Sequence, residues 1–119
     1  MVTKEAIDAA LLAHGQWKKR LQDAISTGQS EFKAVDVKRD DACQFGKWLY
    51  GLPQEDKNSE HYQTVKSLHA DFHKAAGEVL ELAIAGKKQE ALKKLEYDSQ
   101  YGIAAGKLVV ALQLWKAKL

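Results

Sequence analysis

Residues that cross-link or interrupt a chain are scarce in this sequence: its 119 residues include one cysteine, one proline and one methionine. A single cysteine cannot form an internal disulfide, which favours the reducing cytosol as the compartment. Few stretches favour strands, so helices are expected. No apolar run approaches the roughly 18 to 20 residues of a membrane helix. A signal peptide needs a continuous apolar stretch near the N-terminus, and here Glu5 and Asp8 interrupt it.

Net charge is also small, at +2, which argues against nucleic acid as a partner. The lysine pairs at residues 18–19, 87–88 and 93–94 are typical of solvated helix faces. Apolar residues make up 45% of the chain and charged residues 29%, the composition of an ordered globular protein. The length suits one domain with one core, so residues 1–119 are expected to form a single domain.

Apolar residues recur at steps of three and four over most of the chain, the spacing of one helix face. Thr3 and Ser59 (or its neighbour Asn58) are the expected N-caps of the first and third helices, and Asp40 or Asp41 that of the second. The predicted elements are a helix over residues 3–27, a connector over 29–38, a short helix from 40 or 41 to 50, a loop over 54–59, a long helix from there to about 85, and a final helix from about 88 onward. Glycines are expected to end the first three helices, at Gly28, Gly51 and Gly86.

These elements predict an all-α fold. Three long antiparallel helices and a short cysteine-bearing helix would form a four-helix-bundle-like core. On the long third helix the residues predicted to face inward are Tyr62, Val65, His69, Phe72, His73, Ala76, Leu80 and Ile84. In the final helix, Ser99, Gly102 and Gly106 form a stripe of small residues that would let Trp17 or Trp48 approach closely.

Histidines on apolar helix faces are the first chemical signal. His69 and His73 are four residues apart, so both imidazoles project from one face of one helix and can bind one ion. His14 lies on the apolar face of the first helix, between Leu11 and Trp17. A buried imidazole without a partner costs roughly 1–3 kcal/mol, and a shared metal ion would satisfy all three. His61, near the start of its helix, is expected to be a surface residue instead.

Cys43 is the second signal, in the run Cys43-Gln44-Phe45-Gly46-Lys47-Trp48. By itself a lone cysteine is usually a small buried hydrophobe. In the first turn of a short helix, however, the positive end of the helix dipole would favour the thiolate that zinc binds. Gly46 would leave room for a facing backbone, and Phe45 and Trp48 would anchor the short helix in the core.

Together His14, Cys43, His69 and His73 supply the four ligands of a closed tetrahedral site. Three imidazoles and one thiolate suit Zn²⁺, whereas magnesium and calcium require oxygen donors. Copper satisfies the same ligands but is less available in the cytosol. With four protein ligands the site keeps no open position for a catalytic water, so an enzyme is not expected.

Three motifs in order, His14-x-x-Trp17, Cys43-x-Phe45-Gly46-x-Trp48 and His69-x-x-x-His73-x-x-Ala76, resemble the chemoreceptor zinc-binding (CZB) domain of bacteria. The resemblance extends over nearly the whole chain and fills all four ligand positions. It implies a cytosolic regulatory domain that holds zinc through three histidines and one cysteine. It also implies sensing of zinc, or of oxidants such as hypochlorous acid, in chemotaxis or cyclic-di-GMP control.

The resemblance further implies partners. Such domains are attached to a chemoreceptor signalling region or a diguanylate cyclase, which act as homodimers, so an output domain in cis or in trans and a homodimer are expected. This sequence contains no output domain, so it is a stand-alone member or a fragment.

Two other readings stay open from sequence. The chain could be a helical interaction module whose zinc is purely structural, or whose histidines are coincidental. It could also be a three-histidine zinc enzyme in which Cys43 does not coordinate. Membrane and nucleic-acid partners are not expected under any of them.

Overall fold

The fold follows from eight helical segments in a computed structural model, which describes residues 2–119. Within that range there is no strand, so the predicted all-α class is confirmed. The helices are α1 Lys4–Gly15, α2 Trp17–Thr27, α3 Ala34–Val37, α4 Gln44–Tyr50, α5 Gln54–Lys57, α6 Glu60–Ile84, α7 Lys88–Lys94 and α8 Gln100–Ala117. None of the helices in this range combines the length and apolar character that crossing a bilayer requires.

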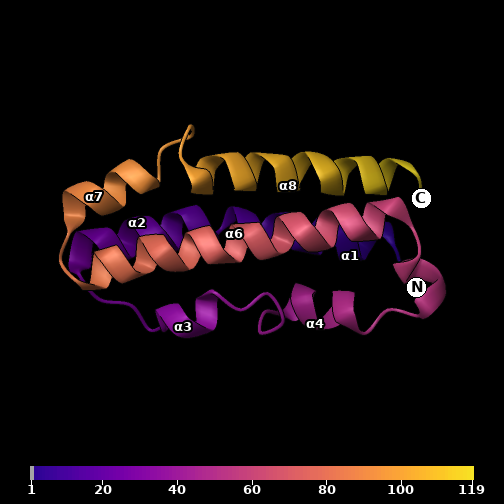
Figure 1. Cartoon of the computed structure of the whole chain (residues 1–119), viewed down its shortest axis with the longest axis horizontal. Helices are drawn as coiled ribbons and strands as arrows, with labels where there is room; N and C mark the ends of the chain where they lie inside the picture. Colours follow the sequence, from indigo (N-terminus) through magenta and orange to yellow (C-terminus); the bar gives the residue numbers. More distant parts are fainter. Residues whose placement is uncertain (1) are drawn as a thin grey trace.

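Three rods and one broken segment lie side by side along a long axis of 45 Å (Figure 1). The first rod is α1 with α2, the second is α6, and the third is α7 with α8. The segment carrying α3 and α4 joins the first rod to the second and returns along the edge of the bundle opposite α7 and α8, so successive members alternate in direction as in a four-helix bundle. Helix α6 contacts α2, α3, α7 and α8, which makes it the centre of the packing.

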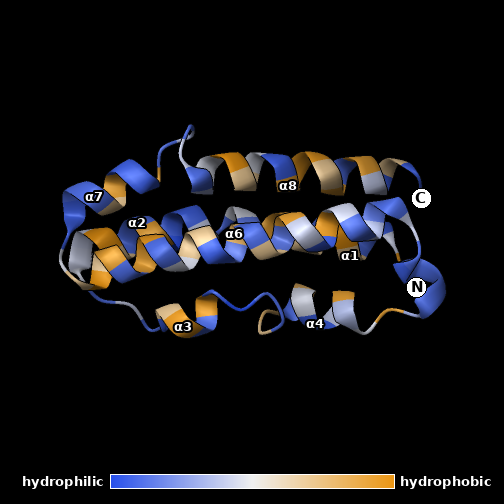
Figure 2. Cartoon of the chain, in the orientation of Figure 1, coloured by the Kyte–Doolittle hydropathy of each residue, from blue (hydrophilic) through white to orange (hydrophobic). Residues whose placement is uncertain are grey.

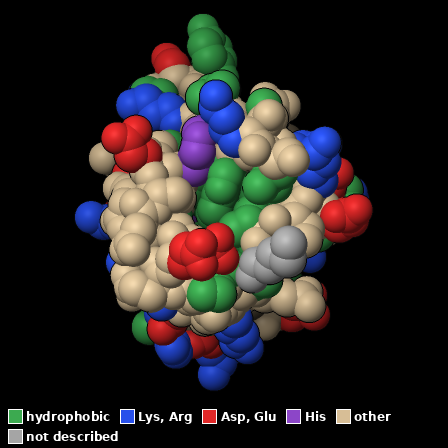
Figure 3. Space-filling view, turned by 90° about the vertical axis from the view of Figure 1, so that its right-hand side faces the viewer, with side chains coloured by type: hydrophobic (Ala, Val, Ile, Leu, Met, Phe, Trp, Pro, Cys, Tyr) green, Lys and Arg blue, Asp and Glu red, His purple; other side chains and the backbone are tan. Residues whose placement is uncertain are grey.

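Hydrophobic and hydrophilic residues alternate along the helices, as the colouring in Figure 2 shows. In an end-on view, hydrophobic side chains occupy the hollow in the middle and charged ones lie mostly around it (Figure 3). The fully buried hydrophobic residues include Ile7, Leu21, Leu49, Val65, Phe72, Leu80, Leu108 and Leu112. Of the inward positions predicted for α6, all are buried except Ile84, which is 46% exposed. Ile84 is the last residue of its helix, and the residue before it, Ala83, is fully buried.

Capping residues fix where the long helices begin and end. The hydroxyls of Thr3 and Ser59 accept hydrogen bonds from the backbone N–H of Ala6 and Tyr62. Gly28 and Gly86 follow α2 and α6 with φ of 75° and 78°, the left-handed conformation that glycine adopts without strain. These four predicted boundaries are confirmed.

Two of the three predicted long helices are interrupted. At Gln16 the first rod turns locally, although hydrogen bonds from Gln16 to Leu12 and from Arg20 to Gln16 continue across the junction. The final rod breaks over residues 95–99, and Ser99 caps α8 by accepting a hydrogen bond from Gly102 N–H. The one-turn helices α3 and α5 were predicted as connector and loop because four residues are too few to show a period.

The stripe of small residues does not receive a tryptophan. Ser99 is a helix cap, and a Cβ at Gly102 would overlap the carbonyls of Glu96 and Tyr97 in the turn that precedes α8. Gly106 meets nothing within 4 Å. That prediction was wrong because Ser99 and Gly102 serve the break in the rod rather than a neighbouring helix, and Gly106 has no neighbour to receive.

The two glycines of α8 give a matched test of this packing. Gly102→Ala should destabilise the fold by about 1–3 kcal/mol, because the new methyl group meets backbone carbonyls that cannot easily move. Gly106→Ala should stabilise it by about 1 kcal/mol, since the site is open and alanine favours a helix. Urea denaturation of both variants measures the difference, and shifts of the same sign would contradict the assignment.

Candidate metal centre

Four side chains meet in the middle of the bundle, and they are the four predicted from sequence. His14 comes from the last turn of α1, Cys43 from the residue before α4, and His69 and His73 from the centre of α6. Their potential ligand atoms all lie within 4.8 Å of one another. The three histidines are buried and Cys43 is half-buried. His61 is half-buried and lies outside this cluster.

Helix spacing brings the pair on α6 together. His69 Nε2 lies 3.0 Å from His73 Nε2, and Cys43 Sγ lies 3.3 Å from the same His69 nitrogen. A tetrahedral zinc site with Zn–N of about 2.0–2.1 Å and Zn–S of about 2.3 Å places its ligand atoms about 3.3–3.6 Å apart. These two separations are close to that spacing.

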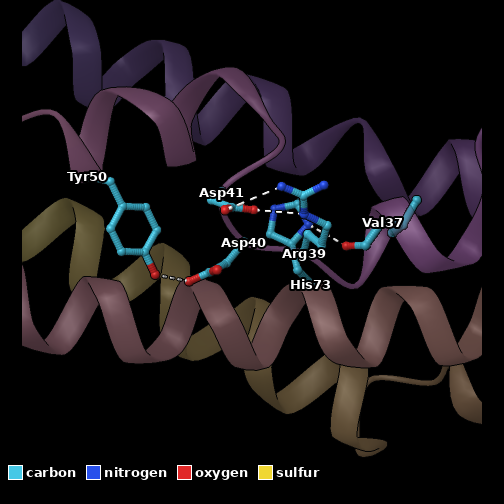
Figure 4. A network of polar contacts seen from close by, with 6 residues as sticks. All are labelled: Val37, Arg39, Asp40, Asp41, Tyr50 and His73. Atoms are coloured by element: carbon cyan, nitrogen blue, oxygen red, sulfur yellow. Dashed lines mark hydrogen bonds and ion pairs between the residues drawn. The ribbon is translucent and has the colours of Figure 1, made fainter.

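Backbone carbonyls orient two of the rings. His14 Nδ1 lies 2.7 Å from the Ala10 carbonyl, and His73 Nδ1 lies 2.8 Å from the Val37 carbonyl, as Figure 4 shows for His73. A carbonyl only accepts, so both Nδ1 atoms carry the proton, and in the neutral rings both Nε2 lone pairs are free to bind a metal. Such outer partners are typical of metal-binding histidines.

His69 completes the fit. Its Nδ1 is buried and has no hydrogen-bond partner. Its Nε2 faces the Nε2 lone pair of His73 and the sulfur of Cys43. A single proton on His69 Nε2 cannot make good hydrogen bonds to both His73 Nε2 and Cys43 Sγ. A cation between the three atoms would bind all of them. The donor set therefore fits a Zn²⁺ ion.

Burial keeps the imidazoles neutral, which is the form that binds metal. Burial lowers the pKa of His14 to about 4, against the opposing hydrogen bond to Ala10. Burial and then the neighbouring His73 and His14 rings lower the pKa of His69 to about 2. The pKa of His73 is also lowered by burial, although Val37 and Asp40 oppose the shift.

Cys43 occupies a different place from the one predicted. It is itself the N-cap of α4, and its Sγ accepts a hydrogen bond from Gly46 N–H at 3.2 Å, so neither Asp40 nor Asp41 is the cap. Burial raises the pKa of the thiol more than the Gly46 N–H lowers it. The expectation that the helix start alone favours a thiolate was wrong, because the short helix contributes less than desolvation costs. A bound cation would supply the missing stabilisation.

Aromatic rings enclose the centre. Phe45 lies 5.6 Å from the His14 ring and 5.1 Å from the His69 ring, and Phe72 lies 5.2 Å from His14. Trp48 stacks on Phe45 at 5.4 Å and lies 6.2 Å from Trp115 of α8. The predicted anchoring of the short helix by Phe45 and Trp48 is thus confirmed.

The loop before Cys43 is fixed by contacts that sequence reasoning missed (Figure 4). The Tyr50 hydroxyl donates to the Asp40 carboxylate at 2.5 Å, and this bond with burial raises the pKa of Tyr50 to about 12. Arg39 pairs with Asp41 at 3.1 Å. A Cβ at Gly46 would overlap the Asp40 carbonyl, which confirms the predicted close approach of backbone at that glycine.

Neither the Asp40–Tyr50 pair nor the carbonyls of Ala10 and Val37 left a signal in the sequence. Every residue carries a carbonyl, and a separation of ten residues across a loop has no period. Only Gly46, a glycine inside a short helix, marked the tight contact.

The comparisons with known proteins agree with this geometry. The family described as the chemoreceptor zinc-binding domain matches residues 14–80, which include all four clustered side chains and most of α6. No curated protein and no solved structure matches the chain. The match spans more than half of the sequence and names the metal that the donor set selects. The chain belongs to the chemoreceptor zinc-binding domain family.

Proposed function

We propose that residues 1–119 form one zinc-binding regulatory domain whose single Zn²⁺ is held by His14, Cys43, His69 and His73. Chemoreceptor zinc-binding domains bind zinc, and these four residues lie close enough to form a metal site. The observation that carries the assignment is the meeting of four ligand atoms within 4.8 Å, with carbonyl partners behind two of the imidazoles.

The regulatory step is placed at Cys43. The three histidines belong to the long rods, whereas Cys43 belongs to the segment between α3 and α4, which contains no long helix. Oxidation of the thiolate to a sulfenic acid would give a poorer ligand. Residues 41–50 would then loosen, while the rods keep the core residues that lie away from the site.

An enzyme is the weaker alternative. It requires Cys43 to stay out of the ligand set, yet the Cys43 sulfur lies 3.3 Å from His69 Nε2. A purely structural zinc remains the competing hypothesis, in which Phe45 and Trp48 would shield the half-buried cysteine from oxidants. The oxidation experiment below separates it from the switch.

Family membership supports a proposal about the cellular process in which the domain acts. We place the domain in bacterial cytoplasmic signalling, in chemotaxis or cyclic-di-GMP control. Its partners would be a chemoreceptor signalling region or a diguanylate cyclase, in cis or in trans, in a homodimeric assembly.

Single alanine variants test the ligand set. His14→Ala, Cys43→Ala, His69→Ala and His73→Ala should each weaken zinc binding by more than the roughly 100-fold that loss of an outer partner costs. His61→Ala is the matched control, because His61 lies on α6 but outside the cluster. Metal analysis and competition with a chromophoric chelator measure the affinity, and zinc loss from the control equal to that of His73→Ala would refute the assignment.

Removal of zinc should destabilise the fold without abolishing it. At free zinc 1,000 times the Kd, binding contributes about 4 kcal/mol, so a chelator should lower the Tm by about 10 °C or more. The bundle should stay partly helical, since its apolar core extends well beyond the site. Circular dichroism follows both effects. An unchanged Tm would mean that the histidines have other partners.

Oxidation should act locally. As hypochlorous acid is titrated, zinc content should fall together with hydrogen-exchange protection of residues 41–50, while protection in α6 and α8 is largely kept. Zinc that stays bound until the tryptophans and Met1, which lies outside the described residues, are oxidised would favour the structural role. Simultaneous unfolding of the whole bundle would also contradict the switch.

A further inference from the structure

An open cleft leads from the protein surface to the metal centre. It has a volume of about 490 Å³, and His14, Cys43 and His73 all line it. Clefts that bind small molecules typically measure about 300–1,000 Å³. The half-buried Cys43 therefore borders a space large enough for a small organic molecule and not only for an ion.

The outer wall of this cleft carries a fixed cation. The Arg20 guanidinium lies 5.1 Å from the Trp17 ring centre and 5.2 Å from that of Phe32, and the two rings are themselves 5.1 Å apart. Stacking on two rings holds the guanidinium in place and leaves its N–H groups available. No carboxylate within residues 2–119 forms an ion pair with Arg20.

Charges of both signs surround the opening. Besides Arg20, the cleft is lined by Lys33 and Arg39 and by the carboxylates of Glu31 and Asp36. Arg39 is already paired with Asp41. The remaining charges balance, so the lining suits a molecule that has both carboxylate and ammonium groups.

The chemistry of Cys43 indicates which molecule of this kind would use the cleft. The chain has one cysteine, so a sulfenic acid at Cys43 cannot be resolved by an internal disulfide. An external thiol must reach the sulfur. We propose that the cleft binds a small aminothiol carrying a carboxylate, of the amino-acid or short-peptide class, with Arg20 holding the carboxylate.

The reaction balances in two steps. The thiol sulfur attacks the sulfenic acid, Cys43–SOH + RSH giving Cys43–S–S–R and water. A second thiol then attacks the mixed disulfide on the RS sulfur, which releases the Cys43 thiol and leaves RSSR. Hypochlorous acid or a peroxide supplies the initial oxidation, so this inference rests on the proposed switch.

Thiol–disulfide exchange tests the cleft without that oxidation. Zinc-free protein, shown to be folded by circular dichroism, is mixed with oxidised glutathione, which carries carboxylates and ammonium groups, or with cystamine, which carries only ammonium groups. Mass spectrometry measures the rate at which each forms a mixed disulfide with Cys43. The ratio of the two rates cancels any change in the reactivity of the thiol itself.

Arg20→Glu should lower the ratio of glutathione to cystamine rates by about fivefold, and the effect should shrink as salt is added. Lys18→Glu is the matched control, because it makes the same charge change on α2 but lines a different cleft, between α1 and α8. Arg20→Gln should give a smaller decrease of the same sign. Equal ratios in the two Glu variants, or no reaction of Cys43 in the folded protein, would overturn the proposal. Zinc retained on oxidation would instead refute the switch.

Discussion

Three neutral imidazoles buried around one point are the constraint on which the centre of this molecule depends. His69 and His73 place two Nε2 atoms 3.0 Å apart, and the carbonyl behind His73 fixes its lone pair toward the contact. Such an arrangement costs free energy in an apolar core unless a cation occupies it. The rods carry these rings on their inner faces, so the packing of α1 against α6 and the binding of a metal ion depend on each other.

The carbonyls that orient the two imidazoles come from different parts of the chain, one nearby in the sequence and one distant. His14 is oriented by the carbonyl of Ala10 in its own helix, one turn earlier, so α1 prepares that ligand by itself. His73 is oriented by Val37 of α3, a residue that reaches α6 only when the returning segment has packed. The α3–α4 segment therefore affects the site twice, through the Val37 carbonyl and through the Cys43 sulfur.

Sequence reasoning found the four clustered residues because each stood out against its surroundings: three histidines interrupted apolar stripes, and Cys43 preceded a glycine inside a short helix. It found the caps at Thr3 and Ser59 for a similar local reason. It missed the break at Gln16, since the spacing of the inner face continues through Trp17 to Leu21. It also missed the break at residues 95–99, although residues 98–100 are polar. It also misjudged the thiol of Cys43, because the burial that raises its pKa arises only when the chain around it has folded.

Cys43 differs from the three histidines of the cluster in the way that its backbone is held. A histidine on a 25-residue helix moves only if α6 moves, and α6 contacts every rod of the bundle. Cys43 is held by a seven-residue helix, the Gly46 backbone contact and the Asp40–Tyr50 hydrogen bond. Hydrogen bonds of this kind contribute about 1 kcal/mol each, far less than the core of a bundle. A chemical change at the sulfur can therefore outweigh the free energy that holds the Cys43 segment and still be much smaller than the free energy that holds the long helices together. The proposed local switch in a stable domain requires this difference.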